Sequence, residues 1–279
     1  MLVNNQKSQI KKITNKEMKK ELILLLFITT GCFAQQTIET MFTPPNGYER
    51  IYQDGYSQFL RQFPLKENNV VKYYNGEEKF NDNIWAAVYD YEIGTEDLHQ
   101  CADAVLYMRA NYLFTNGIKD QLYYNFVSGY NAKYNDWLSH YYKIRGSSVS
   151  LEPRTNPLED NLETFAKWIR QIWMYANTWS IDTYNSDPVA IKDMKPGDFF
   201  IQSNPPPAVG HAINVVDVAV NPSTGKKVFM LSQSFMPAQQ THILLNPETG
   251  DVWYYLNEFK NIETPEWMFT VNELKRFKN

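Results

Sequence analysis

The chain has 279 residues and a formal net charge of −4, with 27 Lys and Arg against 31 Asp and Glu. This acidic balance, without a long basic run, argues against a nucleic-acid-binding protein, because phosphate contacts require clustered Lys and Arg. The length suits one sizeable hydrophobic core.

The first 34 residues have the pattern of an export leader. A second methionine at Met18 precedes two lysines and the apolar run LILLLFITTGCFA, which is too short for a membrane-spanning helix. We expect either cleavage after Ala34 or lipid attachment at Cys32. The sequence thus predicts a leader over 1–34, a single domain over 35–279 without a transmembrane span, and a location in the periplasm or cell envelope. The six Lys and two Glu of the leader leave this domain with a charge of about −8.

The sequence of the first part of this domain predicts short helices and strands. SQFLRQFPLKENN indicates a helix that stops at Pro64, VVKYYNGEEK indicates a hairpin around Asn75-Gly76, and WAAVYDYEI indicates a strand that ends at Gly94. A helix then begins near Thr95 or Asp97.

Cys101 lies near the start of this helix and is the lone cysteine outside the leader. Asp97 and Gln100 have the spacing of a capping box, which places Cys101 in or just past the first turn. The amides of a helix N-terminus favour a thiolate, so Cys101 is a candidate nucleophile. Free cysteines are also often buried, and Cys101 lies on the apolar stripe of the helix. Without an internal disulfide partner, the thiol stays free, pairs with another chain, or performs chemistry.

The remaining chain predicts one more long helix followed by strands. An aromatic stretch, SGYNAKYNDWLSHYYKIRG, precedes the amphipathic segment NLETFAKWIRQIWMYANTWSI. Strands are then predicted in MKPGDFFIQS, HAINVVDVAV, KKVFMLSQSF and THILLNP. Helices first and antiparallel strands afterwards indicate an α+β fold with the Cys101 helix packed on the sheet.

His211 is the best placed of the four histidines to act as a base. It begins a strand directly after Gly210 and a loop of three prolines, whereas His99 is expected on the Cys101 helix, facing elsewhere. With a turn centred on Ser223-Thr224, Gln233 lies opposite Ile213 or His211 and on the same face as His211, where its amide oxygen orients the imidazole.

Asp217 is expected on that face too, but too far along the strand to orient His211. His140 lies in a polar, aromatic stretch and His242 on a late strand. No pair of histidines has a ligand-like spacing with Cys or carboxylates, so we expect no metal site and no cofactor.

DLHQCADAVLYMRANYL, KPGDFFI, GHAINVVDV and MLSQSFMPAQQTHILLNP together resemble a family of secreted bacterial proteins known as a domain of unknown function. The chain has a Cys at a helix start, then GD before a strand, then Gly-His opening the next strand, and then a polar residue on the strand after it. This order is similar to that of NlpC-type peptidases of papain-like fold. This likeness implies that Cys101 is the nucleophile, His211 the base, Gln233 the orienting residue and Asp198 part of a structural turn.

The leading hypothesis is an exported cysteine peptidase or amidase that acts on a cell-wall peptide or a similar amide. The alternative is a non-catalytic envelope protein that binds glycan or peptide through Tyr130–Tyr142 and the loop Asn204–Val209. A third hypothesis is a structural protein that forms an intermolecular disulfide through Cys101. The sequence leaves the oligomeric state open.

Overall fold

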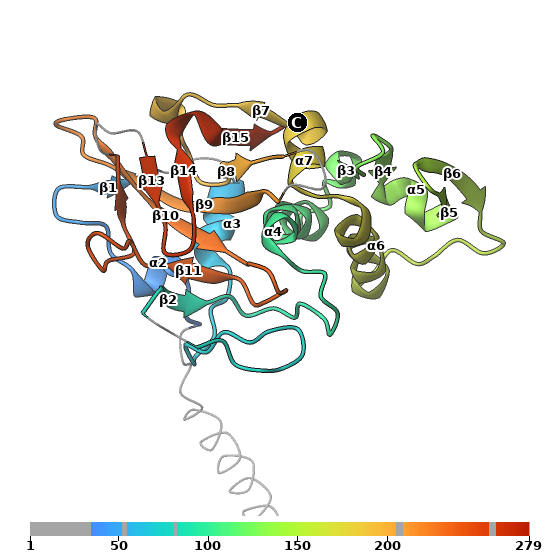
Figure 1. Ribbon diagram of the computed structural model, residues 1–279, viewed down its shortest axis with the longest axis horizontal. Helices are drawn as coiled ribbons and strands as arrows, with labels where there is room; N and C mark the ends of the chain where they lie inside the picture. Colours follow the sequence, from blue (N-terminus) through green and yellow to red (C-terminus); the bar gives the residue numbers. More distant parts are fainter. Residues whose placement is uncertain (1–34, 52–54, 81–82, 205–208, 257–260, 279) are drawn as a thin grey trace, which may run out of the picture. The chain divides into compact units, whose positions relative to one another are not determined.

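The long central sheet organises the fold (Figure 1). The computed structural model describes residues 35–51, 55–80, 83–204, 209–256 and 261–278. The predicted leader, with Cys32, and the triproline part of the loop 204–209 lie outside the described residues. Gln36–Asn279 form one compact unit. No helix in the described ranges is long and apolar enough to cross a membrane.

Nine strands form the sheet, and they pair antiparallel. Their order is β2 (Trp85–Val88), β11 (His242–Leu244), β10 (Lys227–Gln233), β9 (His211–Val220), β8 (Phe199–Gln202), β15 (Leu274–Phe277) and β7 (Ser186–Pro188), with β1 (Glu49–Arg50) also pairing with β9 and β12 (Tyr254–Tyr255) with β10. Three separate two-stranded pairs are β3 (Tyr123–Asn125) with β4 (Asn131–Lys133), β5 (His140–Arg145) with β6 (Ser148–Pro153), and β13 (Asn261–Glu263) with β14 (Met268–Thr270).

The helices come mainly before the sheet in the chain. They are α2 (Ile38–Met41), α3 (Gly55–Gln62), α4 (Cys101–Thr115), α5 (Tyr134–Ser139), α6 (Leu162–Tyr175) and α7 (Thr178–Ser180), with short turns of 3-10 or π-helix at Lys119–Gln121, Ile181–Asn185, Ile191–Asp193 and Val271–Glu273. The predicted α+β class is confirmed, with a mostly antiparallel sheet.

α4 is the central helix, and it is buried on nearly all sides. It packs against β9 and lies beside α6 (Figure 1). Val105 and Leu106 share an apolar cluster with Ala212 of β9 and Phe165 of α6. The predicted helix over α6 is confirmed, and its first turn is capped by Asn161, whose side chain accepts a hydrogen bond from Thr164 N at 3.0 Å.

The opposite face of β9 has its own core. Ile213 and Val215 pack there with Phe229 of β10 and with Phe269 of β14. The two faces of β9 therefore belong to different cores, and its alternating side chains decide which core each residue joins. This alternation separates His211 from Ala212.

β9 carries one extra residue in its pairing with β10. Asp217 pairs with Met230, but the next pair joins Val215 to Leu231. This bulge changes which side chains share a face beyond it. The expectation that Asp217 lies on the face of His211 is therefore wrong.

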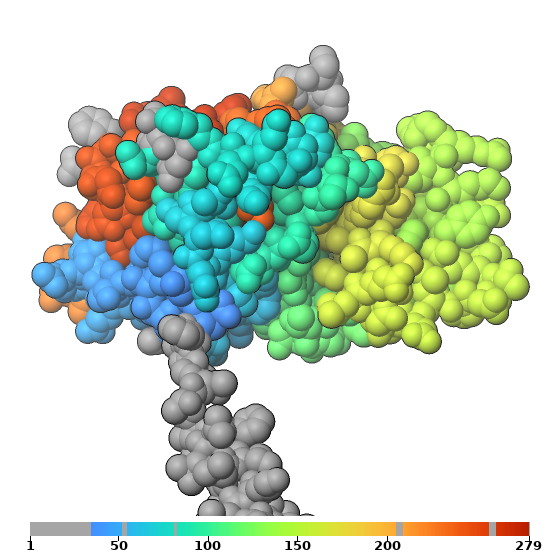
Figure 2. All heavy atoms as spheres, turned by 90° about the horizontal axis from the view of Figure 1, so that it is seen from below, coloured from blue at the N-terminus to red at the C-terminus, as the bar shows by residue number. Residues whose placement is uncertain are grey.

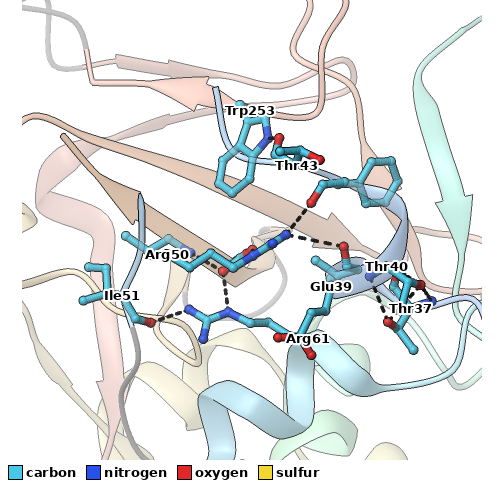
Figure 3. Close-up of polar contacts among 12 residues, drawn as sticks. Thr37, Glu39, Thr40, Thr43, Arg50, Ile51, Arg61 and Trp253 are labelled. Atoms are coloured by element: carbon cyan, nitrogen blue, oxygen red, sulfur yellow. Dashed lines mark hydrogen bonds and ion pairs between the residues drawn. The ribbon is translucent and has the colours of Figure 1, made fainter. Parts of the chain in front are cut away.

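Asp217 instead binds two arginines from the first part of the chain. Its carboxylate accepts from Arg50 Nε and from Arg61 Nε, both at 2.6 Å. The Arg61 guanidinium also donates to the carbonyl of Ile51 (Figure 3). Asp217 is fully buried and Arg61 is 1% exposed, so this cluster fixes α3 and β1 to the middle of β9.

The helices and strands before α4 agree in part with those predicted from the sequence. α3 ends before Pro64 as predicted, and the turn at Asn75-Gly76 is closed by a hydrogen bond from Tyr73 N to the carbonyl of Glu77 at 2.8 Å. β2 ends at Val88, earlier than the predicted strand end at Gly94.

Candidate active site

Cys101 is the first residue of α4. Gln100 is the N-cap, and its backbone N–H donates to the carboxylate of Asp103 at 3.0 Å. The predicted capping box at Asp97 is therefore wrong by three residues. Asp97 lies before the helix, where its carboxylate accepts from the Gln100 side chain at 3.1 Å and from Ala238 N at 2.6 Å. These contacts join the start of α4 to the segment that follows β10.

The Cys101 thiol is buried, with the residue 6% exposed. Burial raises the pKa of this thiol to about 11, although the backbone N–H of Ala212 opposes the rise. The negative charge of Asp103 raises the pKa further, while the amides of Ala102 and Cys101 lower it. The loss of solvation thus outweighs the helix N-terminus, and the expected resting thiolate is not favoured.

Cys101 and Gly210 line the same cleft, so the thiol lies near the start of β9, and the Ala212 amide lowers the pKa of the thiol. No hydrogen bond joins the side chains of Cys101 and His211 in the described chain. Ala212 belongs to the core beneath α4, whereas the His211 ring packs on Phe235 and Phe269 on the other side. The Cys101 thiol and the His211 ring therefore lie on opposite faces of the start of β9.

His211 and Gln233 are in direct contact. His211 is the first residue of β9, Gln233 is the last of β10, and His211 Nε2 lies 3.0 Å from Gln233 Oε1. The observed pairing of Ser232 with Asn214 continues to Gln233 opposite Ile213, the first of the two predicted registers.

The His211 imidazole is neutral near neutral pH. Its residue is 2% exposed, and burial lowers its pKa to about 4; the Gln233 contact raises the pKa and the charge of Lys79 lowers it. A neutral imidazole is the form that can accept a proton as a base.

Glu266 determines which way the Gln233 amide faces. The Gln233 Nε2 donates to Glu266 Oε2 at 2.6 Å, and Lys79 Nζ donates to both oxygens of this carboxylate at 2.8 Å. Since a carboxylate only accepts, the amide oxygen of Gln233 faces His211 and the imidazole proton lies on Nε2. His211 Nδ1 then carries the lone pair, and it makes no hydrogen bond with any residue that the structure describes.

Glu266 and Lys79 were not predicted from the sequence. Glu266 lies between β13 and β14, and Lys79 follows the turn at Asn75-Gly76, so 187 residues separate them. Neither residue lies in a motif, and their meeting depends on how the β13–β14 pair covers the sheet.

A cleft of about 250 Å³ opens at Cys101. Its walls include the start of α4, Trp173 of α6, Thr178 of α7 and the backbone of Gly210. Gly210 is required here, because a Cβ atom at this position would lie 2.2 Å from the carbonyl oxygen of Gln202 and 2.6 Å from Thr178 Oγ1. His211 is not among the lining residues of this cleft.

The other histidines make separate contacts. His99 precedes α4, which corrects its expected place on the helix, and its Nε2 lies 3.0 Å from Tyr91 Oη. His242 is buried, and its Nδ1 lies 2.9 Å from the carbonyl oxygen of Gln240. His140 begins β5. Among the described residues, no group of three or more His, Cys, Asp or Glu could hold a metal ion.

Asp198 has the structural position that the likeness implied. It is fully buried and accepts from Lys195 N at 2.9 Å and from Arg276 Nε at 2.6 Å. The preceding Gly197 has a φ of +94°, which closes the turn before β8.

The aromatic stretch Tyr130–Tyr142 belongs in part to the core. Tyr134, Trp137 and Tyr142 are buried, and the rings of Tyr130 and Tyr142 are 5.7 Å apart. This packing occupies much of the surface that the binding hypothesis assigned to a ligand.

The comparisons with known proteins give one match. The family described as a domain of unknown function, DUF4846, matches residues 38–276. No curated protein and no solved structure matches the chain. The match spans both β9 and α4, together with Glu266 and Lys79. It agrees with the predicted relation to a domain of unknown function, and the chain belongs to the DUF4846 family.

Proposed function

We propose that the protein is an exported cysteine peptidase or amidase of NlpC-type papain-like fold, acting on a cell-wall peptide or a similar amide. The observation that carries this proposal is that the Cys101 cleft is lined by Gly210, the residue before His211, while Gln233 Oε1 lies 3.0 Å from His211 Nε2. A helix with Cys at its start, packed on antiparallel strands that bear His and Gln, supports the papain-like assignment.

The reaction begins from an uncharged pair. The Cys101 thiol, with its pKa near 11, and the neutral His211 imidazole, with its pKa near 4, both stay uncharged at pH 7. His211 Nδ1 accepts the thiol proton as Sγ attacks the carbonyl carbon of the amide, and the carbonyl electron pair moves to the oxygen. This transfer requires the start of β9 to rearrange when substrate binds, because the His211 ring lies on the opposite face of the strand from the thiol.

The developing charges have partners in the site. Unpaired amides in the first turn of α4 stabilise the oxyanion. Gln233 accepts from the imidazolium at Nε2. His211 then gives its proton to the leaving amine as the C–N bond breaks, and water, deprotonated by His211, releases the acyl group from Cys101.

The test uses turnover of cell-wall stem peptides, followed by chromatography of the products. Cys101→Ala and His211→Ala should each lower turnover at least about 1,000-fold. His140→Ala is the matched control, since His140 lies in β5 outside the site, and it should retain turnover. Full activity of Cys101→Ala with an unchanged thermal midpoint would refute the assignment.

The burial of Cys101 supports a second candidate, the non-catalytic binding protein. A thiol that is 6% exposed and makes no hydrogen bond to His211 is also suited to a structural cysteine. This candidate predicts that peptide binds equally to the protein and to Cys101→Ala, without products. Calorimetry and product analysis on the same samples separate the two functions.

A further inference from the structure

A second cavity lies next to the Cys101 cleft. Its volume is about 400 Å³, and its walls come from α4, α6 and the segment 92–98. Leu98 and Trp173 line both this cavity and the Cys101 cleft. The two spaces are therefore neighbours separated by the side chains of Leu98 and Trp173.

The walls of the cavity are mostly apolar, although Glu92 and Asn111 also line it. Ile93, Phe165 and Ile169 are between 2% and 6% exposed, and they line it together with Tyr107 and Ala166. In Figure 2 the segment that runs into α4 and the α6 segment lie side by side on the surface. Cavities of this size with mostly apolar walls are typical of small-molecule sites.

The rim of the cavity carries an ion pair. Arg170 donates to the carboxylate of Glu96 through Nε and Nη2, both at 2.6 Å. The two side chains are 42% and 53% exposed. Exposed pairs of this kind contribute little to stability. This exposed ion pair thus leaves the interior of the cavity apolar, and it does not hold the entrance closed.

We propose that this cavity binds an extended apolar group of the substrate, such as an acyl chain, while the amide of that substrate lies at Cys101. That the bound molecule is a substrate rests on the proposed hydrolase function. The binding of an apolar group is argued from the cavity alone. An apolar occupant is favoured because burial of each methylene is stabilising and because the interior offers few polar partners. Because Leu98 and Trp173 line both spaces, the occupant lies beside the Cys101 cleft.

The experiment measures binding without turnover. The probes are N-octanoylglycinamide and N-acetylglycinamide, titrated by calorimetry into the Cys101→Ala protein. The longer chain should bind at least about tenfold more tightly, since six additional methylenes become buried. Adding Ala166→Trp, which fills the cavity from α6, should abolish this difference. Lys167→Trp is the matched control, because Lys167 is the next residue of α6 and does not line the cavity.

Each outcome has a separate meaning. Equal affinities for the two probes, or a chain-length preference that survives Ala166→Trp, would overturn the cavity assignment. Thermal unfolding of both tryptophan variants shows whether α6 remains folded, and Ala166→Leu gives a milder filling if Ala166→Trp unfolds the protein. A preference lost in Ala166→Trp, combined with no hydrolysis of either probe by the protein that retains Cys101, supports the apolar site and counts against the hydrolase alone.

Discussion

Alkylation of Cys101 as a function of pH tests the uncharged resting state. Burial moves the pKa of the thiol from 9.0 to about 11, which lowers the thiolate fraction at pH 7 about 100-fold. Only the thiolate reacts with iodoacetamide. We therefore expect Cys101 in the folded protein to react at least about 100-fold more slowly at pH 7 than the same cysteine in denaturant, and the rate to rise through pH 10.

The assay is mass spectrometry of the peptide that contains Cys101, after timed exposure to iodoacetamide between pH 6 and 11. His211→Ala should change the rate at pH 7 less than about threefold, because no charged Cys-His pair exists at rest. A rate that levels off below pH 8 and is lost in His211→Ala would refute the reasoning, since it would require a thiolate paired with an imidazolium.

Two further predictions concern the polar groups around β9. Asp217→Asn should lower the free energy of unfolding by roughly 3–5 kcal/mol, because it leaves Arg61 buried without its charge partner; urea unfolding measures this, and a loss below about 1 kcal/mol would contradict it. Glu266→Ala should lower kcat about tenfold or more and alter its pH profile, because the Gln233 amide loses the acceptor that orients it. Glu266→Gln retains an acceptor and should restore most of kcat, whereas equal losses in both variants would indicate that the charge itself is required.

The hairpin that bears His211 and Gln233 could be predicted because its determinants are local. The turn between Val220 and Lys227 sets the pairing of β9 with β10 as far as Asp217 and Met230, and continuous apolar runs mark both strands; beyond that point the bulge shifts the register by one residue. The bulge between Val215 and Asp217 has no local signal. The bulge lies where Asp217 binds two arginines from outside the hairpin. The face on which Asp217 lies therefore could not be derived from the alternation of side chains alone.

The start of α4 was predicted three residues too early because two capping patterns overlap. Asp97 and Gln100 have the same spacing as Gln100 and Asp103, and only the tertiary contact of Asp97 with Ala238 decides between them. The observed start places Cys101 at the first helical position, where the free amides are nearest. The sequence thus correctly predicted that Cys101 lies in the first turn of the helix, although the predicted N-cap residue was wrong.

The ionisation of Cys101 shows why a motif alone does not determine the state of a site. Helix amides stabilise a thiolate by a limited amount, whereas burial in an apolar surrounding destabilises it by more. Cys101 is 6% exposed, and it lines a cleft with Trp173 and Gly210, so its burial depends on contacts distant in sequence. A site that is uncharged at rest develops charge only when a substrate is attacked, and the dry surroundings then strengthen each hydrogen bond to the oxyanion and the imidazolium. In the proposed reaction, an apolar substrate group in the neighbouring cavity would keep water out of the site while this charge develops.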